Sequence, residues 1–206
     1  MKTRDRILQI SLDMFNEYGE PNITTNHIAD EMGISPGNLY YHFRNKDEIV
    51  YLLFERFEQQ MNDILVAPEQ RAPDMEDMWL YLHLIFETIW KYRFLYRDLN
   101  NLLSRNKKLK THFKRILNRK IATAIAICEG LVETEVMQAS PREIEALANN
   151  IVVVATYWLN FQSIHPSPNT SNQLGQGAYQ VISLVVPFLR GAEHELLEQL
   201  SQVYLD

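Results

Sequence analysis

Apolar side chains recur every three or four residues along most of the chain, which is the spacing of amphipathic helices. Ile7, Leu8, Leu12 and Phe15 form the first such face, and Gly19 ends it. Further helices are predicted over residues 24–32, 35–43, 47–65, 74–97, 99–105, 107–131, 141–164 and 172–189, with a tail at 192–204. Since no segment shows the period of two typical of a strand, we predict an all-α protein of about nine helices.

Two segments interrupt the helical pattern. Residues 67–73 contain two prolines and are the evident linker, and residues 165–171 form a loop rich in Pro, Ser and Asn. We divide the chain into a domain of residues 1–47 and a larger helical domain of residues 48–206, and the helix at 47–66 links the two.

Composition narrows the classes of protein. The chain has 206 residues, of which 46% are hydrophobic and 22% charged, as in an ordinary globular protein. No window approaches the roughly 18 apolar residues of a membrane span, and the N-terminus lacks the apolar run of a signal peptide. Cys128 is the single cysteine, which excludes an intramolecular disulfide and a cysteine-rich metal site. We therefore expect a cytoplasmic protein that does not enter the membrane.

Motifs for catalysis are missing from the sequence. The six histidines show no metal-ligand spacing, and we find no Gly-rich phosphate loop, nucleophile motif or carboxylate–histidine set. We therefore expect a protein without enzyme activity, metal or cofactor.

Residues 24–43 contain two short helices joined by a tight turn. Thr24 or Thr25 can cap the first helix, and Gly33 permits the turn. Ser35 followed by Pro36 suits the start of the second helix. This arrangement is typical of a helix-turn-helix, whose second helix enters the major groove of DNA. A helical hairpin with packing aromatics is the alternative.

The second of these helices has an inner and an outer face. Leu39 and Phe43, four residues apart, point inward onto Ile28. The outward or end-on positions hold Pro36, Gly37, Asn38, Tyr40, Tyr41 and His42. The amides of the first turn are unpaired and positively polarised, so they suit a phosphate. Gly37 lets the backbone approach DNA closely, and Asn38 can bond an adenine edge.

Residues 3–50 carry a specific signature: the helix that ends at Phe15 and Gly19, the strings TTNHIADEMGIS and GNLYYHF, and Lys46 after them. This segment resembles the N-terminal domain of the tetracycline-repressor (TetR) family of bacterial transcription regulators. The resemblance implies a three-helix DNA-binding domain followed by a larger helical domain for ligand binding and dimerisation. Beyond residue 50 it extends only to the number, length and general character of the helices.

The resemblance also implies roles for individual residues. Thr25, Tyr41 and Lys46 match positions that commonly contact phosphates. Positions at or near the bases are matched by Ser35, Gly37, Asn38, Tyr40 and His42. Pro36 stands where a polar or basic residue is often found. For His42, a capping or packing role is the alternative to a DNA contact.

The net charge of the N-terminal region argues against strong DNA binding. Residues 1–60 hold six Lys or Arg and ten Asp or Glu, a net charge of −4, whereas nucleic-acid-binding domains are usually basic. The basic residues are nevertheless clustered, since Arg44 and Lys46 flank the second short helix. We therefore expect modest non-specific affinity for DNA, because phosphate neutralisation dominates that affinity.

Residues 104–120 form a second basic feature, with eight Lys or Arg and no acid. Three interpretations stay open: a solvated helix face, a second nucleic-acid surface, or a face that meets the acidic N-terminal domain. In the resembled family, the sixth and seventh helices lie next to the DNA-binding domain and relay the ligand signal.

Bulky aromatic residues are concentrated in the larger domain. Such residues more often form core than pocket, but members of the resembled family bury a ligand cavity among these helices. The resemblance therefore implies an apolar effector pocket with a few polar groups. Our candidates for its lining are His83, Phe86, Glu87, Trp90, Phe113, Thr123, Cys128, Tyr157, Asn160 and Phe161.

Two apolar stripes on the last helices suggest a homodimer interface. One comprises Ile144, Leu147, Ala148, Ile151, Ala155, Trp158 and Leu159, and the other Leu174, Ala178, Val181, Ile182, Val185 and Leu189. Two such helices from each subunit would form a four-helix bundle across a two-fold axis, with a kink at Pro187. The alternative is that the stripes complete the core of the monomer.

The sequence thus predicts a ligand-responsive, sequence-specific DNA-binding regulator. The resemblance implies a repressor that a small hydrophobic effector releases from a palindromic double-stranded operator. A helical adaptor without DNA binding is the alternative, although it would have no use for exposed Gly37, Asn38 and Tyr41.

Overall fold

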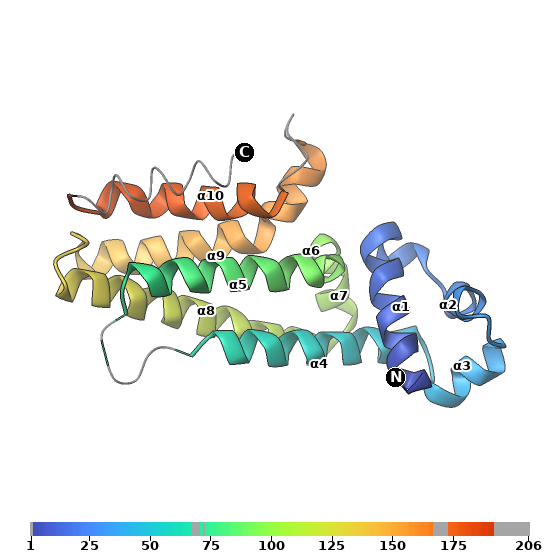
Figure 1. Ribbon diagram of the computed structural model, residues 1–206. Helices are drawn as coiled ribbons and strands as arrows, with labels where there is room; N and C mark the ends of the chain where they lie inside the picture. The colour runs from blue at the N-terminus through green and yellow to red at the C-terminus, as the bar shows by residue number, and fades with distance from the viewer. Residues whose placement is uncertain (1, 67–70, 72, 167–172, 192–206) are drawn as a thin grey trace. The chain divides into compact units, whose positions relative to one another are not determined.

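The computed structural model describes residues 2–66, 71, 73–166 and 173–191 (Figure 1). Its α-helices are α1 Thr3–Tyr18, α2 Thr25–Met32, α3 Pro36–His42, α4 Lys46–Ile64, α5 Met75–Lys91, α6 Arg93–Arg97, α7 Leu99–Arg105, α8 Lys107–Glu133, α9 Pro141–Ile164 and α10 Gln173–Val185. Short 3₁₀ turns occupy Glu20–Asn22 and Val186–Phe188. Within these described ranges there is no strand, only one antiparallel bridge between Met137 and Leu189. The all-α prediction is therefore confirmed.

The chain folds into two compact units that do not follow a single cut in the sequence. Unit 1 comprises residues 1–60 and 92–113, and unit 2 comprises residues 61–91 and 114–206. Helices α4 and α8 each contribute residues to both units. The division at residue 47, as a border between DNA-binding and ligand-binding functions, stays a prediction.

Unit 1 has a continuous aromatic core. The rings of Phe15 and Phe94 lie 5.3 Å apart, so α6 packs on α1. Phe57 of α4 meets Tyr92 and Tyr96 edge to face. The Phe94 amide also donates to the Asn16 side chain at 3.0 Å. Residues 92–113 therefore complete the core of the N-terminal unit.

The predicted helix at 74–97 is broken in the structure. Helix α5 ends at Lys91, and α6 begins at Arg93. Tyr92 between them has φ −114° and ψ 35°, outside the helical region, and its side chain is buried. The apolar pattern continues through the break, because both sides of it face a core, and so the pattern alone did not show it.

Unit 2 is a set of packed helices in which α9 and α10 run side by side (Figure 1). Helix α10 also contacts α5. The close contact of α10 with α5 and α9 requires Gly177. A Cβ atom at this position would lie 2.4 Å from Phe86 Cε1 of α5 and 2.7 Å from Trp158 Cδ1 of α9. Close packing of the three helices thus depends on a residue without a side chain.

The two apolar stripes predicted for a dimer interface belong largely to the core of this unit. Ile144, Leu147, Ala148, Ala155 and Leu159 of α9 are buried, as are Ala178, Val181, Ile182 and Val185 of α10 and Leu189 just beyond it. The side chain of Leu174 lies outside the described residues. The exposed apolar residues of α9 are instead Val153, Tyr157, Phe161 and Ile164. The buried members of both stripes thus complete the core of this unit, as the alternative held for part of each, whereas Ile151 and Trp158 are only half-buried. A dimer interface formed by these two helices stays a prediction.

The C-terminal part of the chain differs from the predicted helix. Pro187 does not kink the last helix, because α10 ends at Val185 and Pro187 lies in the 3₁₀ turn that follows. The predicted tail at 192–204, residues 67–70 and 72 of the linker, and residues 167–171 of the loop lie outside the described residues. Among those that are described, no helix is long and apolar enough to cross a membrane.

Candidate functional site

Helix α2 begins and ends with local contacts that its sequence specifies. The Thr24 hydroxyl accepts a hydrogen bond from the His27 amide at 3.2 Å, and the Thr24 amide donates to His27 Nδ1 at 3.4 Å. His27 takes the place that Glu or Gln usually holds in such a reciprocal cap. Gly33 ends the helix with φ +65°, a left-handed conformation that disfavours any side chain.

Helix α3 begins with Ser35 as its cap and Pro36 at its first position. The Ser35 hydroxyl accepts from the Asn38 amide at 3.2 Å. The prediction that the amides of this turn are unpaired is therefore wrong for Asn38, since Ser35 already binds it. Pro36 has no amide hydrogen to offer. The cap leaves less of the helix end available to a phosphate than the sequence suggested.

The inner face of α3 is fixed as the sequence predicted. Leu39 and Phe43 are 0% and 1% exposed, and Ile28 and Ala29 of α2 are fully buried. Helices α2 and α3 contact each other, and α2 contacts α1. The buried residues thus hold α3 in one orientation, with its other face turned to solvent.

That outer face carries the predicted DNA-contacting residues. Ser35, Pro36, Gly37 and Asn38 are exposed, and so are Tyr40 and Tyr41, at 50% and 84%. The Tyr40 hydroxyl shares a hydrogen bond of 3.0 Å with the Thr25 hydroxyl. Tyr41 meets the ring of His42 edge to face, with 5.1 Å between centroids. The structure therefore brings eight of the nine predicted residues together around α3.

Lys46, the ninth, makes contacts that the sequence did not indicate. Its Nζ lies 3.0 Å from Oε1 of Glu20 and donates to the Glu20 carbonyl at 2.9 Å. Arg105, at the end of α7, reaches the same carboxylate oxygen at 2.6 Å. Glu20 is fully buried, and its Oε2 has no hydrogen-bond partner among the described residues. We call these three residues the Glu20 cluster; it joins the start of α4 to the end of α7.

The start of the basic segment at 104–120 contacts acidic residues of the N-terminal region. Besides Arg105, His112 lies 2.8 Å from the carboxylate of Glu58. Lys108 sits above the ring of Tyr51, 4.2 Å from its centroid. The interpretation in which this segment meets the acidic N-terminal region is therefore supported for these residues. Lys107, Lys110 and Lys114 are exposed.

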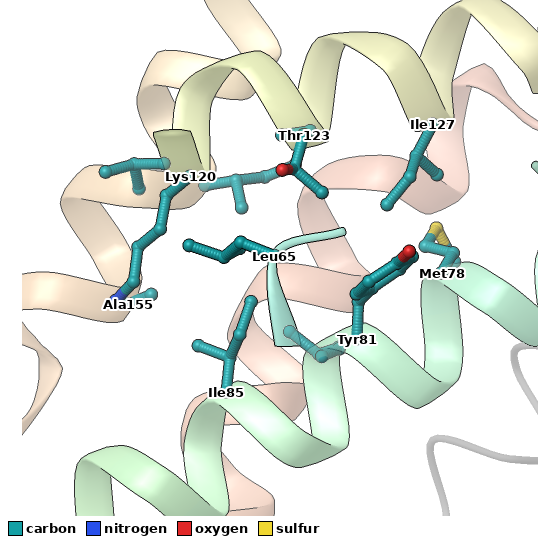
Figure 2. Close-up of a pocket in the computed structure, with 12 residues that line it drawn as sticks. Leu65, Met78, Tyr81, Ile85, Lys120, Thr123, Ile127 and Ala155 are labelled. Atoms are coloured by element: carbon teal, nitrogen blue, oxygen red, sulfur yellow. The ribbon is translucent and has the colours of Figure 1, made fainter. Parts of the chain in front are cut away.

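A small pocket lies within unit 2 (Figure 2). Its cavity has a volume of about 70 Å³. Leu65, Met78, Tyr81, Leu82, Ile85, Lys120, Thr123, Ala124, Ile127, Ile151, Val152 and Ala155 line it. The Tyr81 hydroxyl donates to the Val66 carbonyl. Among the described residues of this lining, Lys120 is the one that carries a charge. Its place in the pocket was not predicted, because it ends the basic segment 104–120, for which none of the three interpretations was a buried pocket.

Of the ten candidate effector contacts, only Thr123 lines this pocket. Phe113 packs against Tyr96 in unit 1, and Phe86 is buried beside Gly177. His83 Nε2 lies 3.5 Å from Oε1 of Glu87 on the surface of α5.

The remaining candidates also lie outside the lining. Tyr157 and Phe161 are exposed on α9, and Trp90 and Asn160 are half-buried. Cys128 is buried, and burial raises the pKa of its thiol to about 11, so it stays protonated near neutral pH. An effector contact for these residues stays a prediction.

Two protein families match the chain. Residues 7–51 match the family described as bacterial regulatory proteins, tetR family, and residues 56–197 match the TetR family described as bacterial transcriptional repressor. The first match contains α2 and α3, and the second spans most of the remaining helices.

Individual proteins give the same result. A solved TetR-family transcriptional regulator from Marinobacter aquaeolei VT8 is 41% identical, with 99% of each chain covered and a TM-score of 0.90. A tetR-family regulatory protein from Rhodococcus RHA1 shares the fold at 18% identity, with a TM-score of 0.68 over 93% of this chain and 99% of that one. An HTH-type transcriptional regulator of Staphylococcus aureus strain USA300 is 42% identical over 55 residues, which is 27% of this chain and 30% of that protein.

The fold and the helix-turn-helix define a DNA-binding regulator rather than an enzyme. The chain belongs to the TetR family of transcriptional regulators.

Proposed function

We propose that the protein is a homodimeric repressor that binds a palindromic DNA operator and leaves it when a small hydrophobic effector occupies the pocket of unit 2. The observation that carries this proposal is the two-sided helix α3. Buried Leu39 and Phe43 fix its orientation, while Asn38 and Tyr41 lie on the surface. The match to a family described as a transcriptional repressor supports the direction of regulation.

In this proposal Ser35, Gly37, Asn38, Tyr40 and His42 lie at the bases of the major groove, with Pro36 among them. Thr25, Tyr41 and Lys46 contact phosphates. An ammonium group has three donors, so Lys46 can meet a phosphate while it holds Glu20. Since phosphate contacts carry no sequence information, the two sets of residues have different effects when changed.

A mobility-shift assay with the DNA upstream of the protein's own gene tests operator binding. We expect Tyr41→Phe and Lys46→Ala to weaken binding to all sequences alike. Lys46→Ala should also reduce the salt slope by about one per protomer. A change of base preference with an unchanged salt slope would show that these residues read bases instead. Failure to shift any fragment of that DNA would count against autoregulation through this operator.

The exposed apolar residues of α9 support a dimer. Val153, Tyr157, Phe161 and Ile164 are 57%, 45%, 54% and 86% exposed, and their spacing places them on one face of the helix. Exposed apolar patches of this kind usually mark a protein interface. We propose that this face, together with α10, packs against its copy across a two-fold axis, so that the recognition helices lie about 34–36 Å apart.

Sedimentation at micromolar concentration tests the dimer. Phe161→Glu should produce monomers and weaken operator binding, because each half-site would then be bound alone. Ala122→Glu, on the exposed side of α8, is the matched control and should leave the dimer intact. A monomeric wild-type protein, with and without DNA, would refute this part of the proposal.

Helix α8 offers a route from the pocket to the DNA-binding region. Lys120 and Thr123 line the pocket, and two turns earlier His112 contacts Glu58. A tenfold loss of operator affinity needs only about 1.4 kcal/mol of coupling between effector and DNA. Ala124→Phe, which fills the pocket, should abolish the response to an effector while operator binding persists. Ala122→Phe is the control that leaves the pocket open.

A further inference from the structure

The pocket of unit 2 combines an apolar wall with one basic group. Aliphatic side chains form most of the lining, and among the described residues that line it Lys120 of α8 is the only charged one. Lys120 is 4% exposed, although most lysines keep the ammonium in water. Burial of an ammonium group has a cost in free energy, so its surroundings determine how readily it carries a proton.

Burial has a chemical consequence for this lysine. Desolvation lowers its pKa to about 7, so that in the empty pocket the charged and neutral forms coexist near neutral pH. An anion bound beside the amine would favour the charged form and would interact strongly, since little water screens the pair. The ammonium has three donors, so a ligand can be bound in addition to contacts within the protein.

We infer that the effector of this pocket is a small amphiphilic carboxylate, whose acid group binds the Lys120 ammonium and whose aliphatic body extends toward Ile127. The inference rests on the proposed function in one respect, namely that this pocket is the effector site. It adds the chemical class of the effector and the residue that selects it.

The layout of the pocket fits a ligand with two different ends. Figure 2 shows the Lys120 nitrogen beside Ala155 at one end, and Ile127 and Met78 at the other. Leu65 lies between them. The cavity of about 70 Å³ is smaller than the engineered cavity of roughly 150 Å³ that holds benzene, so it favours a slim chain over a bulky ring system.

Other head groups fit less well. An amine would place a second positive charge beside Lys120, which disfavours binding. An alcohol can accept a hydrogen bond from the ammonium, but this bond is weaker than the charge-assisted bond to a carboxylate. The hydroxyl of Tyr81 is occupied by the Val66 carbonyl, and burial raises the pKa of Tyr81, so this group stays neutral. The Thr123 hydroxyl can donate to an acid and to an alcohol alike, so discrimination between these two head groups depends on Lys120.

The pH dependence of binding has a definite sign. The described residues that line the pocket come from α5, α8, α9 and Leu65 after α4, and of these only Lys120 and Tyr81 titrate. Since the carboxylate binds the protonated lysine, binding takes up protons wherever the free lysine is partly neutral. Affinity for a carboxylate should thus be greatest between about pH 5.5 and 6.5, where the acid is ionised and the lysine is protonated, and should fall about tenfold per unit well above pH 7. Affinity for the matched alcohol should not change.

The test is titration calorimetry on the full-length protein without DNA. The probes are straight-chain carboxylates from acetate to decanoate, with the alcohol and the amine of each length. We expect at least one chain length at which the carboxylate binds about tenfold or more tightly than both analogues. Equal affinity of acid and alcohol at every length, or no binding of any acid, would overturn the inference.

Two substitutions of lysine on α8 isolate the role of the charge. Lys120→Met keeps the length of the side chain and should weaken carboxylate binding at least about thirtyfold while alcohol binding persists. Lys114→Met is the matched control, because Lys114 is exposed on the same helix. Unchanged carboxylate binding by Lys120→Met would overturn the inference. If that variant does not fold, the wild-type protein provides the test. Titrations near pH 7.5 in buffers of different ionisation enthalpy measure the protons taken up when the carboxylate binds. Proton uptake supports the inference, and no uptake overturns it.

Operator binding is measured separately, so that the two proposals can fail separately. A protein that shifts its operator but binds no carboxylate refutes the effector class and leaves the repressor intact. A protein that binds carboxylates through Lys120 but shifts no fragment of the DNA upstream of its own gene confirms the ligand chemistry and counts against the proposed regulation through that DNA.

Discussion

The helix-turn-helix and the pocket are built in opposite ways. Residues 24–43 form a convex surface from two helices that are adjacent in the sequence, with separate buried and exposed faces. The pocket is concave, and its lining comes from α5, α8, α9 and the residue after α4. In the first region, outer residues can change without loss of fold. In the second, the residues that would touch a ligand also form the core, so binding and stability change together.

The largest effect should come from the inner face of α3. Leu39→Ala removes a fully buried side chain and should lower the free energy of unfolding by about 2–5 kcal/mol. Operator binding should be lost with it. Tyr41→Ala, on the outer face, should change stability by less than about 0.5 kcal/mol while operator affinity falls. Urea unfolding and a mobility shift on both variants measure this; equal stability losses would mean that the two faces are not independent.

The second-largest loss of stability should come from a change in the Glu20 cluster. Glu20→Gln keeps the shape of the side chain but removes the negative charge shared by Lys46 and Arg105. Breaking a buried pair typically costs about 3–5 kcal/mol. Because Lys46 and Arg105 are partly exposed, we expect a smaller loss of about 2–3 kcal/mol in thermal or urea unfolding. Asp47→Asn is the control: it removes an exposed carboxylate 3.5 Å from Arg105 and should cost under about 0.5 kcal/mol.

Gly177→Ala tests whether unit 2 is as closely packed as the Cβ distances indicate. The added methyl group would press on the rings of Phe86 and Trp158. Overpacking of this kind should lower the free energy of unfolding by about 1–2 kcal/mol, despite the better helix propensity of alanine. Ser183→Ala, exposed on the same helix, should stay within about 0.5 kcal/mol of wild type. A Gly177→Ala protein of unchanged or higher stability would show that the three helices can separate freely.

A glycine-to-alanine substitution in the helix-turn-helix should have the opposite effect on stability. At Gly37 the nearest atom to an added Cβ is Ser35 Oγ, at 3.9 Å, so there is room for alanine. Gly37→Ala should raise stability by about 0.5 kcal/mol while it weakens operator binding, because the backbone could no longer approach DNA as closely. Thermal unfolding and a mobility shift on one preparation measure both quantities. Unweakened operator binding would place Gly37 away from DNA.

The sequence predicted best what depends on local chemistry. Thr24, Ser35 and Gly33 act on neighbouring backbone groups, so the boundaries of α2 and α3 could be inferred, as could the inward direction of Leu39 and Phe43. The burial of Glu20 could not be inferred, because an acidic residue after a glycine normally lies in water. Its partners are also 26 and 85 residues away in the sequence. The burial of Lys120 could not be inferred either, because it ends a basic segment whose other lysines are exposed. On α9, apolar residues occupy more than one face, so the pattern did not show which face the core takes.

The division of unit 1 between residues 1–60 and 92–113 has a consequence for how the chain is made and how it can be recombined. During synthesis the DNA-binding region cannot close its core when residue 60 leaves the ribosome, since Phe94, Tyr96 and Arg105 are still to come. It must wait while the first part of the pocket region is translated. A hybrid regulator that joins this head to another effector domain after residue 47 would leave the head without these partners. Such a hybrid should therefore also carry residues 92–113.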